Sequence, residues 1–122
     1  MSIQLNHTIV RARDHHASAE FLASILGLPV GEDVGHFAPV VLANDVTLDY
    51  MTVADPQPQH YAFLVSDAEF DAAFARIKER GLSYYAQPGG GGRGQIYTRS
   101  DSRGVYFDDP DGHAMEILTR VP

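Results

Sequence analysis

Two stretches of the chain repeat their apolar residues with the period of a helix. The first covers about residues 14–26, with Asp14 at the N-cap position and Gly27 at the C-cap position. The second follows Ser66, which starts a capping-box sequence, and ends before Gly81. Its apolar residues lie at the helical spacing, namely Phe70, Ala73, Phe74 and Ile77. The chain is therefore expected to contain two amphipathic helices.

Shorter segments alternate apolar and polar residues, which predicts strands. The segment that begins at His60 directs Tyr61, Phe63 and Val65 to one face, and His60, Ala62 and Leu64 to the other. Further strands are expected around His7 and near residues 37–42, 46–53, 83–86, 104–107 and 113–120. The run Asp109-Pro110-Asp111-Gly112 is strong turn chemistry, so the last two of these strands should form a hairpin.

The two halves of the chain are related by an internal repeat. Matching residues lie 53 positions apart (60 − 7 = 53), namely His7 and His60, Asp14 and Asp67, and Phe21 and Phe74. This order predicts an α+β fold of two tandem βαβββ modules, at about residues 1–54 and 59–122, within one domain of residues 1–122. The modules are expected to form a curved mixed-sheet cup with the helices on its outer face. Such a concave surface is where small molecules usually bind.

Composition narrows the possible functions. The 122 residues include no cysteine, so thiolate metal sites, cysteine nucleophiles and disulfides are excluded. A net charge of −7, with nine Lys and Arg in total, argues against nucleic acid as a partner. The first residues lack the basic and long apolar regions expected of a signal peptide, and no apolar stretch approaches membrane-spanning length. The sequence thus predicts a soluble, cytoplasmic protein without a membrane partner.

Four polar residues interrupt otherwise apolar strands at equivalent points of the repeat. His7 and His60 lie in the opening strands of the two halves, and Asp49 and Glu116 lie in the last strands. A single strand histidine is usually structural, and a lone acid in an edge strand usually faces water. Two imidazoles and two carboxylates brought together would instead suit one divalent ion, either Zn²⁺, Ni²⁺, Fe²⁺, Mn²⁺ or Co²⁺. Their matched places in the repeat favour the metal site.

Three segments carry a family resemblance: residues 6–10, residues 60–63 and, most specifically, residues 104–116. They resemble the signature segments of the vicinal oxygen chelate superfamily, which contains glyoxalase I, bleomycin resistance proteins and extradiol dioxygenases. The resemblance implies a metal held by His7, His60 and Glu116. It places Asp49 where glyoxalase I-like members have a fourth ligand, a glutamate. Because aspartate is one methylene shorter, Asp49 either coordinates the ion or acts as a base beside it.

The resemblance implies an enzyme in which the metal acts as a Lewis acid on a substrate chelated through adjacent oxygens. Glu116 and Asp49 are then the candidate catalytic bases. A glyoxalase-like lyase or isomerase and an Fe(II) dioxygenase remain open, as do the substrate and the metal. The alternatives are a metal-free drug-binding protein of the bleomycin-resistance type and a metal-binding domain without catalysis. The four candidate ligands favour the enzyme, since a metal-free binder needs none of them.

Several further residues have two interpretations each. Arg93, Arg99 and Arg103 are candidate contacts for an anionic substrate, although solvated surface charge also explains them. Tyr106 either turns its hydroxyl into the cup or belongs to the core. His113, which follows the turn, is expected on the surface.

The remaining expectations concern a loop and the assembly. The glycine-rich residues 89–94 are expected to form a mobile flap or a simple connection. The edges of the short sheets favour a homodimer. Whether the cup forms within one chain or between two chains stays open.

Overall fold

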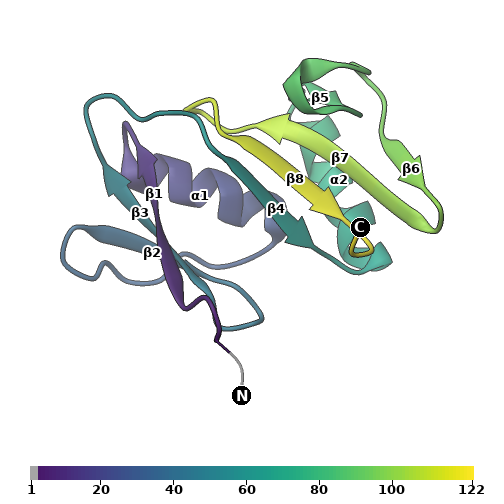
Figure 1. The fold of residues 1–122 in the computed structure, drawn as a ribbon. Coiled ribbons are helices and arrows are strands. Elements are labelled where there is room, and N and C mark those ends of the chain that lie inside the picture. The colour runs from purple at the N-terminus through teal and green to yellow at the C-terminus, as the bar shows by residue number, and fades with distance from the viewer. Residues whose placement is uncertain (1–2) are drawn as a thin grey trace. The chain divides into compact units, whose positions relative to one another are not determined.

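The computed structural model describes residues 3–122 and assigns the chain to the α+β class, as the sequence predicts. The chain divides into two compact units, residues 1–57 and residues 58–122. Each unit combines one α-helix with one sheet that has both parallel and antiparallel strands (Figure 1). No helix within residues 3–122 is long and apolar enough to cross a membrane.

The first unit contains three strands and a helix. In chain order these are β1 (His7–Ala12), α1 (His15–Leu26), β2 (Phe37–Val41) and β3 (Thr47–Thr52). The sheet order is β1-β3-β2, in which β1 runs parallel to β3 and β2 runs antiparallel to it. Two strands follow the helix in this unit.

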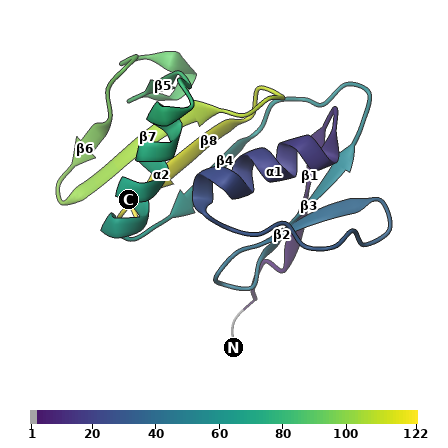
Figure 2. The same ribbon diagram turned by 180° about the vertical axis from the view of Figure 1, so that it is seen from behind.

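Helix α1 is capped as its sequence predicts. The side chain of Asp14 accepts a hydrogen bond from the Ala17 N–H, and Gly27 ends the helix in the left-handed conformation with φ of 75°. Leu22 and Ile25 are fully buried. Figure 2 shows the helix lying across one face of the β1-β3-β2 sheet, which leaves the opposite face without a helix.

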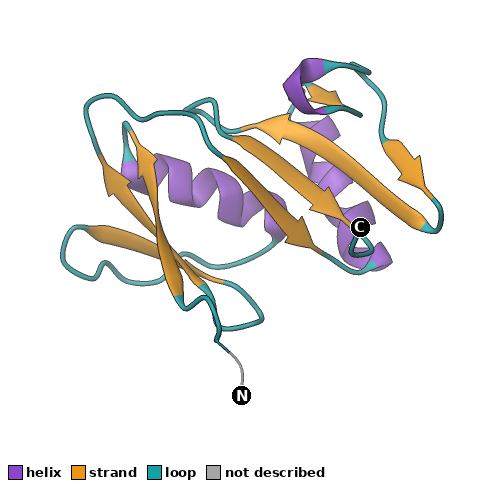
Figure 3. Cartoon of the chain, in the orientation of Figure 1, coloured by secondary structure: helices purple, strands orange, loops and turns teal. Residues whose placement is uncertain are grey.

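The second unit has more strands. Its elements are β4 (His60–Leu64), α2 (Asp67–Glu79), β5 (Tyr84–Tyr85), a 3₁₀ turn η1 (Pro88–Gly90), β6 (Tyr97–Arg99), β7 (Ser102–Asp108) and β8 (Ala114–Leu118). The order is β4-β8-β7-β5, and β6 pairs with β7 (Figure 3). Strand β6 was not predicted from the sequence, because three residues are too few to reveal an alternating pattern.

Helix α2 begins with the predicted capping box. The Ser66 hydroxyl accepts from the Glu69 N–H at 3.1 Å, and the Glu69 carboxylate accepts from the Ser66 N–H at 2.8 Å. Phe70 and Ile77 are fully buried. The helix lies against the sheet on the face opposite that of His60.

The turn before β8 is stabilised by Asp109. Its Oδ1 accepts hydrogen bonds from the backbone N–H groups of Asp111 and His113, at 2.9 and 2.8 Å. The expectation that His113 lies on the surface is wrong, because this side chain is fully buried. Its Nδ1 accepts the Gln59 N–H at 2.9 Å, and its ring packs edge-on against Tyr61, so the buried imidazole is satisfied.

The glycine-rich run forms a hydrogen-bonded turn after β5. The N–H groups of Ala86 and Gln87 donate to the carbonyls of Gly92 and Gly91 at 3.1 and 2.9 Å. The Gly94 N–H returns to the Tyr84 carbonyl at 2.8 Å. The segment is thus an ordered connection between β5 and β6, and its role as a flap stays a prediction.

Candidate metal centre

In the second unit, the predicted histidine and carboxylate lie on two adjacent parallel strands. His60 on β4 is paired with Ala114 on β8, and Ala62 is paired with Glu116. The carboxylate therefore stands opposite the residue two positions after the histidine, on the same face of the sheet.

The first unit repeats this register. His7 on β1 is paired with Thr47 on β3, and Ile9 is paired with Asp49. Asp49 thus occupies the position relative to His7 that Glu116 occupies relative to His60. The sequence repeat is accompanied by an identical strand register at all four candidate positions.

Within each unit, the candidate histidine and carboxylate lie on the face of that unit's own sheet that carries no helix. On the other face of the second unit, alternate residues are buried beneath α2, namely Phe63, Val105, Phe107, Met115 and Ile117. The face that carries His60 is partly open to solvent. Half of the His60 side chain is exposed there, compared with 10% of the Glu116 side chain. A group bound at His60 would therefore be reachable from solvent, while Glu116 is held largely out of it.

The side chains of His60 and Glu116 are in direct contact. Nε2 of His60 lies 3.1 Å from Oε1 of Glu116, and Nδ1 of His60 lies 2.9 Å from the Ala114 carbonyl oxygen. A carbonyl only accepts, so Nδ1 donates to it, and in the neutral imidazole Nε2 then carries a lone pair. The lone pair then faces a carboxylate oxygen, which is unfavourable unless a proton or a cation lies between them.

His7 has the same local arrangement at its Nδ1. This nitrogen lies 2.8 Å from the side-chain oxygen of Asn6, so it donates, and Nε2 is left as the acceptor. Metal-binding histidines typically donate their second ring N–H to an oxygen in this way, which fixes the ring and raises the basicity of the ligating nitrogen. Both candidate histidines thus direct Nδ1 to an oxygen of the protein, which leaves Nε2 as the nitrogen that could bind a cation.

Tyr97 is the residue that the sequence did not indicate. Its hydroxyl donates to Oε2 of Glu116 at 2.5 Å, a short bond of the charge-assisted kind. The pKa of Tyr97 is raised, first by burial and then by this hydrogen bond to an anion. Because Tyr97 lies on the short strand β6, its contact with β8 depends on the pairing of β6 with β7 and leaves no local sequence signal.

Tyr106 extends the aromatic surface around Glu116. It is paired with Glu116 in the β7–β8 register, and its ring centroid lies 5.8 Å from that of His60 and 6.0 Å from that of Tyr97. Burial raises the pKa of Tyr106, and the Glu116 charge raises it further. Tyr106 is half-buried and points to the same face as Glu116.

The three candidate arginines lie in different surroundings. Arg103 forms ion pairs with Asp71 at 2.8 Å and Asp67 at 3.2 Å. Arg93 donates at 3.0 Å to the hydroxyl of Ser83, the residue before β5. Arg99 lies over the Tyr97 ring at 5.6 Å and lines a cavity of about 240 Å³. Of the three, Arg99 is next to the residues that contact Glu116.

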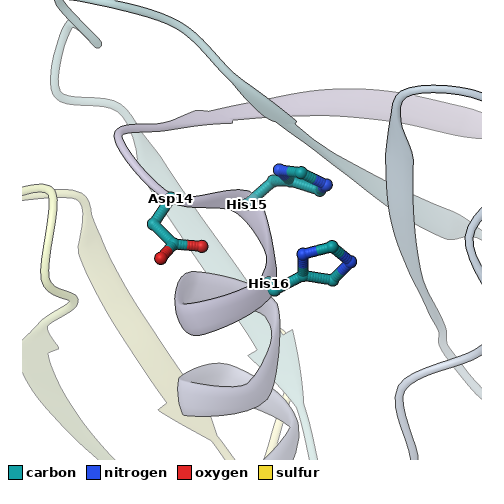
Figure 4. A group of neighbouring side chains, drawn as sticks. All are labelled: Asp14, His15 and His16. Atoms are coloured by element: carbon teal, nitrogen blue, oxygen red, sulfur yellow. The ribbon is translucent and has the colours of Figure 1, made fainter.

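A separate group of potential ligands lies at the start of α1. Asp14, His15 and His16 place one donor atom each within 4.8 Å of the others, as no other three such residues do within residues 3–122 (Figure 4). Each has a local role: Asp14 caps the helix, His15 contacts Thr52 at 2.6 Å, and His16 lies 2.8 Å from Asp33. The positive end of the helix dipole also opposes a cation here. These contacts explain the cluster without a metal.

Comparison with known families agrees with the resemblance seen in the sequence. The model of the Glyoxalase/Bleomycin resistance protein/Dioxygenase superfamily matches residues 4–117, nearly the whole chain. The chain belongs to this superfamily.

The names of individual relatives refer to different reactions. The chain is similar to two solved structures, the oxidase ChaP-H1 and the oxidase ChaP-H2. ChaP-H1 is 55% identical, with a TM-score of 0.95, and the match covers 98% of this chain and 98% of ChaP-H1. ChaP-H2 is 53% identical, with a TM-score of 0.96, and the match covers 99% of this chain and 96% of ChaP-H2. It is also 27% identical over 120 residues to glutathione transferase FosA of Serratia marcescens, covering 93% of this chain and 78% of that protein.

Proposed function

We propose that the chain is a metal-dependent enzyme that oxidises a small organic molecule. In this proposal the two repeats form one domain and supply His7, His60 and Glu116 as ligands to a divalent transition metal, within one chain or across a homodimer. The type of chemistry is inferred from the superfamily, and the ligands are inferred from the residues at matching positions of the two strand registers.

The observation that carries the proposal is the pair of acceptors formed by His60 and Glu116. Their facing atoms are 3.1 Å apart, and the contact of Nδ1 with the Ala114 carbonyl leaves a lone pair on Nε2 toward the carboxylate when the imidazole is neutral. Metal–nitrogen and metal–oxygen bonds of about 2.0–2.2 Å place two adjacent ligand atoms at about this separation. A divalent ion would replace the repulsion by two favourable bonds.

The donor set is suited to an ion of intermediate softness. Two imidazole nitrogens and one carboxylate, with positions left for other molecules, are typical of non-haem Fe(II) sites, and Zn²⁺, Ni²⁺, Mn²⁺ and Co²⁺ accept the same donors. A bound ion would supply Lewis acidity to adjacent substrate oxygens, or a site for an oxidant. Oxidation is favoured over the other superfamily reactions because ChaP-H1 and ChaP-H2, each more than 50% identical to this chain, are named oxidases.

The remaining residues have separate roles in this proposal. Asp49 lies on the helix-free face and is half-buried, so it is our candidate for a base that takes a proton from the substrate. Glu116 is engaged through both oxygens and is better suited to hold an ion than to move. Tyr106 offers a ring face beside His60, and Arg99 offers a positive charge for an acidic substrate group.

Metal content after purification tests this function. We expect close to one transition-metal ion per domain after desalting, or after reloading of the chelator-treated protein with Fe²⁺, Ni²⁺, Zn²⁺ or Mn²⁺. His60→Ala should lose the ion. The exposed loop residue His36 provides the matched control, since His36→Ala removes an imidazole and should keep it. A wild-type protein that takes up none of these ions would support the metal-free binding protein instead.

A further inference from the structure

The phenol of Tyr97 occupies a space that only a glycine provides. A Cβ atom at position 104 would lie 2.0 Å from Cζ and 2.1 Å from the hydroxyl oxygen of Tyr97, far inside van der Waals contact. Gly104 is paired directly with Tyr97 in the β6–β7 register. Its backbone has no left-handed φ, so the absence of a side chain, and not conformational freedom, is what this position uses.

This packing makes the two oxygens of Glu116 different. Oε2 receives the Tyr97 hydroxyl at 2.5 Å, and Oε1 lies beside Nε2 of His60. Glu116 is 8% exposed, so few water molecules are available to replace either contact. Tyr106, paired with Glu116 in the β7–β8 register, also hydrogen-bonds the carboxylate. The Tyr97 hydroxyl therefore holds Oε2, while Oε1 lies on the side of His60.

We propose that Tyr97 is a positioning residue that fixes Glu116 as a one-oxygen ligand, with Oε1 directed to the metal and Oε2 held by the phenol. This inference rests on the proposed metal centre. A carboxylate held through a single oxygen occupies one coordination position instead of two. The position kept open in this way is available to a substrate oxygen or an oxidant.

Tyr97→Phe tests the role of the hydroxyl, because it keeps the ring in the Gly104 space. Loss of a group that hydrogen-bonds a metal ligand typically lowers metal affinity about 10- to 100-fold. We expect a loss in this range for Co²⁺ and Zn²⁺, measured by competition with a chelator. The visible absorption spectrum of the Co²⁺ protein should also change, because the carboxylate becomes free to bind through both oxygens.

Tyr85→Phe is the matched control. Tyr85 also hydrogen-bonds a carboxylate on the same sheet, that of Asp108, and its pKa is raised to about 12 by burial and then by that bond. The control removes the same kind of hydroxyl at a residue without a contact to Glu116. We expect its Co²⁺ affinity and spectrum to match those of the wild type.

Gly104→Ala provides a second, independent perturbation. The added methyl group must displace the phenol, so this variant should weaken metal binding although Tyr97 is still present. If both changes act through the same hydrogen bond, the double variant Tyr97→Phe with Gly104→Ala should bind metal no more weakly than the weaker single variant. Circular dichroism of each metal-free protein establishes that it is folded, and the Tyr97→Phe result stands alone if Gly104→Ala does not fold.

The outcomes separate this inference from the proposed function. If the wild type binds metal and Tyr97→Phe binds it with unchanged affinity and an unchanged Co²⁺ spectrum, Tyr97 does not position Glu116 and the metal centre stands. An equal loss in Tyr85→Phe would also overturn the inference, since the effect would not be specific to Tyr97. A wild type that binds no metal overturns both proposals.

Discussion

Nε2 of His60 lies 3.1 Å from Oε1 of Glu116, although neither atom has a proton to share when the imidazole is neutral with its proton on Nδ1. The side chains belong to parallel strands that are fixed by the β4–β8 ladder, and the Glu116 side chain is largely buried while half of the His60 side chain is exposed. The arrangement is unfavourable unless a proton or a cation lies between the two atoms.

Glu116→Gln and Asp49→Asn distinguish a metal ligand from a base. Glu116→Gln replaces the anionic oxygen next to His60 by a neutral amide group, so we expect metal affinity to fall on the order of 100-fold or more, beyond the cost of losing a supporting hydrogen bond. Asp49→Asn should retain the ion if Asp49 acts as a base. Isothermal titration with Zn²⁺ measures both variants. Equal losses in the two would identify Asp49 as a fourth ligand.

Nitric oxide tests whether the ion has open positions for an oxidant. The protein reloaded anaerobically with Fe²⁺ should bind nitric oxide and give the electron paramagnetic resonance signal of a high-spin iron–nitrosyl, as two-histidine-one-carboxylate sites with open positions permit. The chelator-treated protein serves as the control. Absence of the signal in an iron-loaded protein would argue against oxidation by dioxygen and leave a redox-neutral reaction.

The start of α2 gives a stability prediction that does not involve the metal. Ser66→Ala removes the hydroxyl that accepts the Glu69 N–H, and loss of such a cap costs about 1 kcal/mol, within a range of about 0.5–2. The pKa of Glu69 is lowered by its hydrogen bonds with Ser66, from the backbone first. The stabilisation by Glu69 is therefore present above the normal pKa of glutamate and is lost as the pH falls through the lowered value. Urea unfolding at several pH values measures both effects.

The sequence predicted the elements with strong local signals. Both helices, the caps at Asp14 and Gly27, and the hairpin turn follow from patterns within a few residues of one another, and the structure contains them. The superfamily also followed, because residues 104–116 carry a specific motif.

The features that were missed depend on contacts distant in the sequence. Strand β6 forms by pairing with β7, and the bond from Tyr97 to Glu116 spans 19 positions. The burial of His113 similarly depends on the Gln59 N–H, 54 positions away. From the neighbouring residues alone, such polar side chains are expected to be exposed to solvent. The partner that hydrogen-bonds them in the fold is distant in the sequence and cannot be inferred from a local pattern.

Asp109 provides a test of a buried carboxylate. Oδ1 accepts two backbone hydrogen bonds, while Oδ2 is buried without a partner among the described residues. Asp109→Ala removes the acceptor of both N–H groups and should lower the free energy of unfolding by about 1–3 kcal/mol. Asp109→Asn retains an acceptor oxygen without the charge, so it should keep most of the stability.

The pH dependence of these variants has a defined sign. The pKa of Asp109 is raised by burial, which outweighs the hydrogen bonds that lower it. With a folded-state pKa above the unfolded value, the ionised carboxylate costs stability at neutral pH, and this cost disappears as the pH falls through the raised pKa. The wild type should therefore gain stability relative to Asp109→Asn on acidification, as measured by urea unfolding of the metal-free proteins between pH 7 and about pH 4, near the ordinary pKa of aspartate. A constant difference across this range would show that the carboxylate is hydrated or paired in solution.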